Sequence, residues 1–283
     1  MLSYFQAIVL GVLQGISELF PISSLGHSVI ITGLLGWSID RHGNYFLAFL
    51  VATHFATALT LFVMYWNDWV RIISGIFRSA VKREISDADA KLGWLLVVGT
   101  VPAGLVGLAF QDQVKKLLIS PAFVALFLAT NGALLYVAEV LRKKAKRAAE
   151  VTDADHRLAA DLSWWQSVKV GMMQIIALLP GFSRTGSTIA GGLIVGLSHE
   201  DALRFSFLLA TPIIGAAAAL KLPGLISSGN PAAIGTSIVG GLCAAMGAYF
   251  SVKFLTRYFQ TRTLTPFAIY CALFGLLSLS ILR

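Results

Sequence analysis

Apolar stretches of about 20 residues recur along this chain from one end to the other, and they restrict its fold more than any other feature. A helix that crosses the hydrocarbon core of a bilayer needs about 20 mainly apolar residues. Hydrophobic residues make up 57% of the chain and charged residues 13%, whereas soluble domains average about 45–50% and 25%. The sequence therefore predicts an all-α, polytopic membrane protein with one integral membrane domain, residues 1–283.

Some of these stretches are continuous and others are broken. Continuous transmembrane helices are predicted at about 45–66, 92–110, 122–141, 203–222, 236–256 and 264–282. Pro, Gly and polar residues interrupt the stretches 4–36 and 165–197. We interpret each broken stretch as a re-entrant helical hairpin, and two ordinary spans per stretch are the alternative.

The net charge of +8 comes largely from short basic loops beside the apolar spans. Loop 67–91 and the run 142–147 are rich in Lys and Arg, which predicts that both lie on the cytoplasmic side, near anionic headgroups. Arg257 and Arg262 fall on the same side, whereas Lys115 and Lys116 weaken the contrast between the two sides. Because no basic stripe alternates with aromatic residues, we do not expect nucleic-acid binding.

The two broken stretches resemble each other at a fixed offset of 160 residues. This offset pairs Gln6, Gly11, Gln14, Ile16, Leu19, Ser23, Gly26 and Gly36 with Gln166, Gly171, Gln174, Ile176, Leu179, Ser183, Gly186 and Gly196. Three crossings separate the copies, so the second copy is inverted relative to the first. Residues 4–66 and 165–222 are the predicted cores of this inverted-topology repeat, whose broken helices should meet near the membrane midplane.

The first break carries an acid, an imidazole and two hydroxyls. Gln14 and Glu18 share a helix face because they are four residues apart. Pro21 ends that helix, Ser23 and Ser24 are N-cap candidates, and His27 lies in the first turn of the next helix.

The second break follows the same pattern but carries a cation. Arg184 stands where the first copy has Ser24, and it lies among the hydroxyls of Ser183, Thr185, Ser187 and Thr188. The guanidinium of arginine can form two hydrogen bonds to one phosphate group, and helix N-termini bind anions. A hydroxyl beside a base can attack phosphorus. The two breaks together therefore predict a site for phosphoryl transfer.

Structural roles are the alternative for each of these residues. Glu18 could simply pair with Arg184, Arg184 could reach the headgroups, and His27 and the hydroxyls could cap helices. His54 lies inside a predicted span, where an imidazole either bonds within the core or lines a cavity. The GxxxxG outline from Gly181 lacks the Lys and the preceding strand of a nucleotide-binding P-loop, so we reject that reading.

These motifs resemble those of the bacterial undecaprenyl-diphosphate phosphatase family of the bacitracin-resistance type. The family signatures are an (E/Q)xxxE segment that runs into PxSSxGH, and a second PGxSRSGxT segment. They stand here as Gln14 to Glu18, Pro21 to His27 and Pro180 to Thr188. Of the two residues that the signature allows at position 14, Glu and Gln, this chain has the uncharged Gln14. Thr185 replaces the usual Ser.

The resemblance implies hydrolysis of undecaprenyl diphosphate to undecaprenyl phosphate, which recycles the lipid carrier of cell-wall synthesis. It also implies a site that opens to the periplasmic side of the inner membrane, a divalent cation (Mg²⁺ or Ca²⁺) and often a homodimer. Glu18, Ser24, His27 and Arg184 match the functional residues, with Ser24 as the nucleophile. Glu18 and Gln14 are the expected metal ligands, and Ser23, Ser183, Thr185, Ser187, Thr188, Gln174 and His54 are expected to bind substrate.

Two questions stay open at the level of sequence. Ser24 attacks phosphorus after giving its proton to His27 or Glu18, or it only donates a hydrogen bond while water attacks directly. A membrane transporter or lipid flippase with an anion site between inverted repeats is the alternative function, because that architecture also serves alternating access.

Overall fold

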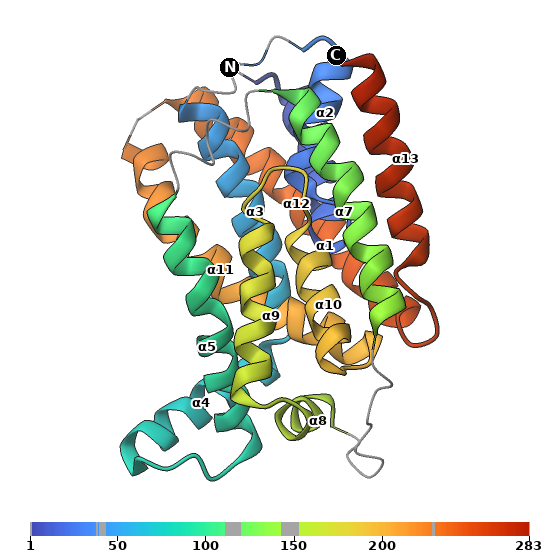
Figure 1. The fold of residues 1–283 in the computed structure, drawn as a ribbon. Helices are drawn as coiled ribbons and strands as arrows, with labels where there is room; N and C mark the ends of the chain where they lie inside the picture. The colour runs from blue at the N-terminus through green and yellow to red at the C-terminus, as the bar shows by residue number, and fades with distance from the viewer. Residues whose placement is uncertain are drawn as a thin grey trace.

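The computed structural model describes residues 2–37, 39, 44–110, 120–142, 153–227 and 230–282, and the regular elements within these ranges are all helices. They are α1 (Tyr4–Leu19), α2 (Ser24–Leu34), α3 (Asn44–Met64), α4 (Trp66–Lys82), α5 (Ala88–Ala109), α7 (Pro121–Leu141), α8 (Ala154–Asp161), α9 (Trp164–Ile176), α10 (Arg184–Val195), α11 (His199–Ser227), α12 (Pro231–Tyr258) and α13 (Thr265–Ile281). Figure 1 shows them as a bundle with both termini at one end. Lys115 and Lys116 lie outside the described residues.

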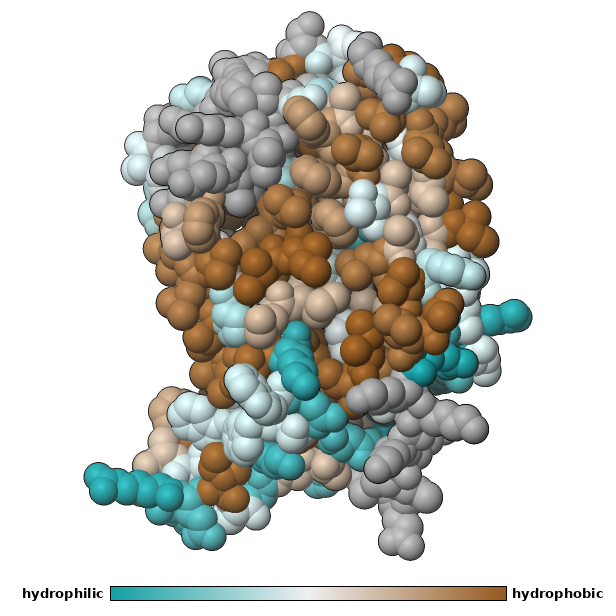
Figure 2. All heavy atoms as spheres, in the orientation of Figure 1, coloured by the Kyte–Doolittle hydropathy of each residue, from teal (hydrophilic) through white to brown (hydrophobic). Residues whose placement is uncertain are grey.

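The predicted membrane spans are confirmed as helices. Within the described ranges, α3, α5, α7, α11 and α12 are each long and apolar enough to cross a membrane. The sixth predicted span is α13, which is apolar and shorter at 17 residues. Hydrophobic side chains cover the middle of the bundle in Figure 2, and hydrophilic ones gather toward the end that carries α4 and α8.

The segment 67–91, which we expected to be a loop, is largely the amphipathic helix α4. Trp69, Ile72, Gly75 and Ser79 are its buried residues, and their spacing of three or four places them on one face. Its exposed positions combine the cations Arg78 and Lys82 with apolar Phe77 (69% exposed) and Val81 (83% exposed), as in helices that lie along a membrane surface. The basic run 142–147 is described only at Arg142.

Ion pairs join α4, α8 and α11 at this end of the bundle. Asp155 of α8 is buried and binds both Arg71 (3.3 Å) and Arg204 (2.6 Å). Burial opposes the charge of Asp153, but N–H groups of His156, Arg71 and Asp155 bind its carboxylate and lower its pKa to about 2. These pairs balance the arginines of this region with neighbouring carboxylates.

Each broken stretch forms a helical hairpin, and the two hairpins are built alike. Ser3 and Gln6 form a capping box at the start of α1, as Ser163 and Gln166 do at the start of α9. Ser23 then caps α2 by accepting from the N–H of Gly26 (3.2 Å), and Ser183 caps α10 in the same way through Gly186 (3.0 Å). Residues 160 positions apart therefore make the same hydrogen bonds.

The two copies also pack alike while they run in opposite directions. Gly11 of α1 lies against the backbone of Gly240 on α12, and Gly171 of α9 lies against Gly99 on α5; a Cβ at either position would meet the facing carbonyl. In Figure 1 the α1–α2 hairpin enters from the end that carries the termini, whereas the α9–α10 hairpin enters from the α8 end. The prediction of an inverted repeat is confirmed.

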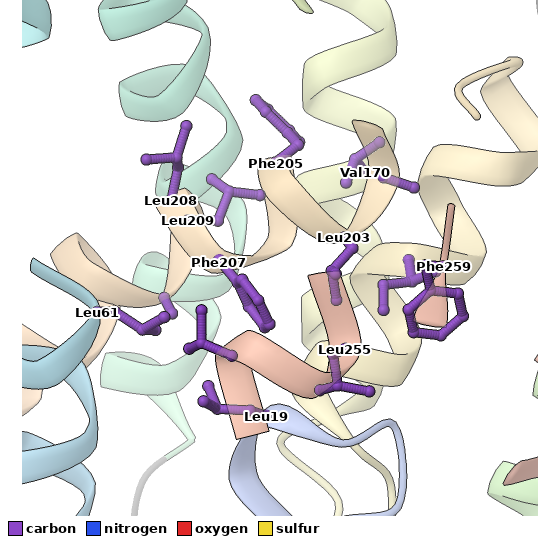
Figure 3. Packing of buried hydrophobic residues seen from close by; sticks show 14 of the residues in the cluster. Leu19, Leu61, Val170, Leu203, Phe205, Phe207, Leu208, Leu209, Leu255 and Phe259 are labelled. Atoms are coloured by element: carbon purple, nitrogen blue, oxygen red, sulfur yellow. The ribbon is translucent and has the colours of Figure 1, made fainter. Parts of the chain in front are cut away.

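Large apolar side chains fill the space between the hairpins and the long helices. Figure 3 shows Phe205, Leu208 and Leu209 of α11 within one cluster that also includes Leu255 of α12 and Leu19. Leu19 is fully buried and is the last residue of α1. Because it follows Glu18 directly, this packing fixes the end of α1 and with it the carboxylate described below.

Candidate active site

The tips of the two hairpins meet inside the bundle. The hydroxyl of Thr185 donates to the carbonyl of Glu18 (2.8 Å), and the hydroxyl of Ser183 donates to the carbonyl of Phe20 (3.3 Å). Asn131 of α7 joins the two breaks, because its amide donates to the Pro21 carbonyl and its oxygen accepts from the Ser183 N–H, both at 3.1 Å. The backbone that α1 leaves unpaired is thus satisfied by the other copy and by α7.

Glu18 is the centre of this meeting point. Its Oε1 accepts from Nη2 (3.1 Å) and Nε (3.3 Å) of Arg184, and its Oε2 accepts from Ser24 Oγ (2.6 Å) and Gln14 Nε2 (3.3 Å). The carboxylate is buried, with 7% of the side chain exposed. A buried charge requires such pairing. Of the predicted catalytic residues Ser24, Glu18, His27 and Arg184, the structure brings Glu18, Ser24 and Arg184 into contact.

His54 of α3 completes the group around Glu18. Its Nε2 lies 3.2 Å from Glu18 Oε2 and 3.4 Å from Ser24 Oγ. Its Nδ1 lies 2.7 Å from the carbonyl of Leu50. Since a carbonyl only accepts, Nδ1 carries a hydrogen, and Nε2 is the nitrogen that faces the reacting groups.

The turn that carries Ser24 has a strained backbone. Ser23 has φ 69° and ψ 100°, a conformation with positive φ that residues other than glycine seldom adopt. It places Ser24 as the first residue of α2, with its hydroxyl on Glu18. Such strain is concentrated at functional sites, where the surrounding contacts hold it.

His27 lies apart from the group around Glu18. Its Nδ1 is 2.7 Å from the carbonyl of Ser23, and its Nε2 is 2.8 Å from the hydroxyl of Tyr270. Its ring also stacks on the rings of Tyr270 and Phe274. Both ring nitrogens are therefore engaged, and the geometry offers Glu18 rather than His27 as the acceptor of the Ser24 proton.

The predicted substrate-binding residues of the second copy differ in their surroundings. Arg184 also donates to Thr185 Oγ1 (3.2 Å) and to the carbonyl of Ser206 (3.3 Å). The hydroxyl of Thr188 bonds to Ser206 Oγ and to backbone carbonyls of α10. Ser187 has a buried hydroxyl without a hydrogen-bond partner, and Gln174 donates to the Gly99 carbonyl (3.1 Å), between α9 and α5 rather than at Glu18.

The sequence of residues 7–277 matches the family model described as Bacitracin resistance protein BacA. The chain belongs to this family. It is 49% identical to the undecaprenyl-diphosphatase of Mycolicibacterium paratuberculosis (strain ATCC BAA-968 / K-10), over 97% of this chain and 95% of that protein. It is 43% identical to undecaprenyl-diphosphatase 2 of Chromobacterium violaceum, over 97% of both chains, and 42% identical to the undecaprenyl-diphosphatase of Acidiphilium cryptum (strain JF-5), over 96% of both chains.

A divalent cation in this BacA-family site would rely on few protein ligands. The described residues contain no group of three or more His, Cys, Asp or Glu side chains that could share an ion. However, Gln14 Oε1 is buried beside Glu18 without a hydrogen-bond partner. One amide oxygen and one carboxylate suit Mg²⁺, which keeps water ligands and binds substrate phosphates. The site therefore fits an ion that arrives with a diphosphate.

Asn131 and Ser206 were not identified from the sequence, although both contact the site. Asn131 is fully buried in an apolar span, and a polar amide at that depth is the signal that could have identified it. Ser206 offers no comparable signal, because hydroxyls are common in membrane helices and its carbonyl rather than its side chain binds Arg184.

Proposed function

We propose that this chain is an undecaprenyl-diphosphatase that hydrolyses undecaprenyl diphosphate to undecaprenyl phosphate and inorganic phosphate. The observation that carries this function is the 2.6 Å hydrogen bond from Ser24 Oγ to Glu18, whose other oxygen is held by Arg184. A hydroxyl, a base and a guanidinium in contact are the parts that phosphoryl transfer needs. Family membership and the names of the relatives agree with it.

Arg184 and the starts of two helices would hold the diphosphate. The helices α2 and α10 begin at Ser24 and Arg184, so both positive helix ends face the same place. Four of the five guanidinium hydrogens of Arg184 are donated to Glu18, Thr185 and Ser206. One hydrogen on Nη1 is left for a phosphate oxygen. Its side chain is 14% exposed, so an anion can reach it.

Ser24 then attacks the terminal phosphorus. Its proton passes to Glu18 Oε2, the Oγ–P bond forms, and the bridging P–O bond breaks to release undecaprenyl phosphate. Water next attacks the phosphoserine, Glu18 returns its proton to Ser24 Oγ, and dihydrogen phosphate leaves. His54, with a hydrogen on Nε2 as well as on Nδ1, donates to Glu18 Oε2 and holds this oxygen beside Ser24 for the attack.

A divalent cation would join this site through Gln14 Oε1 and Glu18, together with oxygens of the diphosphate. It would supply positive charge that neutralises the phosphate oxygens as the P–O bond breaks. Chelation with EDTA should then stop phosphate release, and Mg²⁺ or Ca²⁺ should restore it. Full activity in EDTA would contradict a metal requirement.

The chain is a multi-pass membrane protein, and we infer that its site opens to the periplasmic side of the inner membrane. Basic α4 marks the cytoplasmic end of the bundle, and the hairpin α1–α2, which carries Glu18 and Ser24, enters from the other end. The family resemblance further implies a homodimer. The mass of the purified protein–detergent complex tests this assembly.

Purified protein in detergent tests the activity directly. It should release phosphate from a C55 or shorter isoprenyl diphosphate, and Ser24→Ala should abolish the release while Ser280→Ala, an exposed hydroxyl of α13, should not. Acid quenching should trap phosphate on Ser24; turnover without trapped phosphate would favour direct attack by water. No release but saturable uptake into liposomes would identify a transporter instead.

A further inference from the structure

A basic groove lies at the end of α12, far along the chain from either break. It has a volume of about 480 Å³ and is lined by Lys253, Phe254, Arg257, Tyr258, Thr261 and Arg262. Glu139 of α7 binds the backbone N–H of Leu264 and the ring of His199 nearby. The groove is therefore at the same end of the bundle as the starts of α11 and α13.

The three cations of this groove form no ion pair with a described carboxylate. Lys253 and Arg257 are four residues apart on one helix face, where like charges repel. The turn after α12, closed by the Arg262 N–H on the Tyr258 carbonyl (3.0 Å), brings Arg262 back to them. By contrast, Arg71, Arg157 and Arg204 at this end are all paired with aspartates. An anion would relieve this repulsion.

The groove also has an apolar side that continues along α12. Phe254 stacks on Tyr258 with ring centroids 5.6 Å apart, and it is 52% exposed. One turn earlier, Phe250 is 67% exposed. The Lys253 ammonium lies 4.4 Å from the centroid of the Tyr249 ring, which keeps this cation at the aromatic surface. A ligand that fits both sides has an anionic head and hydrocarbon chains.

We propose that this groove binds the phosphate headgroup of an anionic glycerophospholipid, with the acyl chains along Phe254 and Phe250. Basic pockets between membrane helices take such headgroups. The charge of the groove selects against zwitterionic lipids, and its aromatic wall selects against free phosphate. The ring of Phe20 stacks on Phe254 (5.7 Å), so the bound lipid would also support the backbone that follows Glu18.

Native mass spectrometry of the full chain in detergent, titrated with phosphatidylglycerol, tests this site. The triple variant Lys253→Gln, Arg257→Gln, Arg262→Gln should bind phosphatidylglycerol at least 10-fold more weakly than the wild type. The matched control Lys82→Gln, Lys91→Gln, Lys169→Gln removes the same charge and should bind like the wild type. Phosphatidylcholine should bind weakly, and millimolar inorganic phosphate should not displace phosphatidylglycerol.

Three results would overturn the proposal. They are equal loss of binding in both triple variants, unchanged binding in the groove variant, and displacement by inorganic phosphate, which would indicate a free-anion site. If the groove variant fails to fold in detergent, the single changes Arg257→Gln and Arg262→Gln should each weaken binding about 3-fold, and unchanged binding in both would count against the site. None of these measurements depends on phosphatase activity.

Discussion

The two breaks have nearly the same framework and very different chemistry. Ser23 and Ser183 cap their helices through equivalent hydrogen bonds, whereas Glu18 corresponds to Leu178, and Ser24 to Arg184. The first copy supplies the carboxylate and the hydroxyl, and the second supplies the guanidinium. Residues that build the hairpins were thus kept in both copies, while the reactive residues diverged, and only the contact between copies makes a complete site.

Glu18→Gln should have the largest effect, because this carboxylate accepts the Ser24 proton and balances Arg184. We expect kcat to fall about 10³-fold or more, measured as phosphate release. Glu18→Asp keeps the charge, so it should recover thermal stability without recovering the rate. A Glu18→Gln enzyme within 10-fold of wild type would show that the first copy does not supply the base.

Arg184→Lys should lower kcat/KM about 10²- to 10³-fold, because lysine keeps the charge but loses the planar fork that holds Glu18 Oε1 and the phosphate together. Steady-state kinetics measures this change. Arg184→Gln should be worse than Arg184→Lys. Equal losses in both variants would mean that geometry alone matters at this position.

Substitution of His54 should lower kcat more than substitution of His27. His54→Gln removes the ring that touches Glu18 and Ser24, and we expect kcat to fall about 10²-fold. Among the groups near Ser24, His27 contacts only the Ser23 carbonyl, so the kcat of His27→Gln should fall about 10-fold. A larger loss in His27→Gln would favour His27, the alternative to Glu18, as the acceptor of the Ser24 proton.

The paired glutamines test the divergence most directly. Gln14→Ala removes a hydrogen bond to charged Glu18 and should lower kcat about 10-fold. Gln174→Ala removes the bond to the Gly99 carbonyl, so it should lower stability by about 1 kcal/mol and keep kcat within about 2-fold. Phosphate release and thermal unfolding in the same detergent measure the two effects. Equal kinetic losses would mean that both copies touch substrate.

The paired glycines should instead behave alike, because they belong to the shared framework. Gly11→Ala and Gly171→Ala each force a Cβ against a facing backbone carbonyl. We expect each to lower the free energy of unfolding by about 1–3 kcal/mol, measured by thermal unfolding. If only one of the two substitutions lowered the free energy of unfolding, the helix packing of the two copies would not be equivalent.

The features that could be predicted from the sequence follow from local physical rules. Helix spacing predicted the spans, caps predicted the starts of α2 and α10, and the spacing of Gln14 and Glu18 placed them on one face, as observed. The fixed offset predicted the repeat. The amphipathic pattern of α4 was also present in the sequence, although we took that segment for a loop.

The distant groups that complete the site could be identified only from the packing of the helices. His27 is close to Glu18 and Ser24 in the sequence, which favoured it as the histidine of the site. The ring that contacts Glu18 is instead that of His54 on α3, and Asn131, which joins the two breaks, comes from α7. Helix periodicity states which residues share a face, whereas the packing of all neighbouring helices sets the rotation of each helix and so which face turns toward Glu18. The sequence therefore predicted Glu18, Ser24 and Arg184 as site residues. The packing of the helices determines that His54, rather than His27, contacts Glu18.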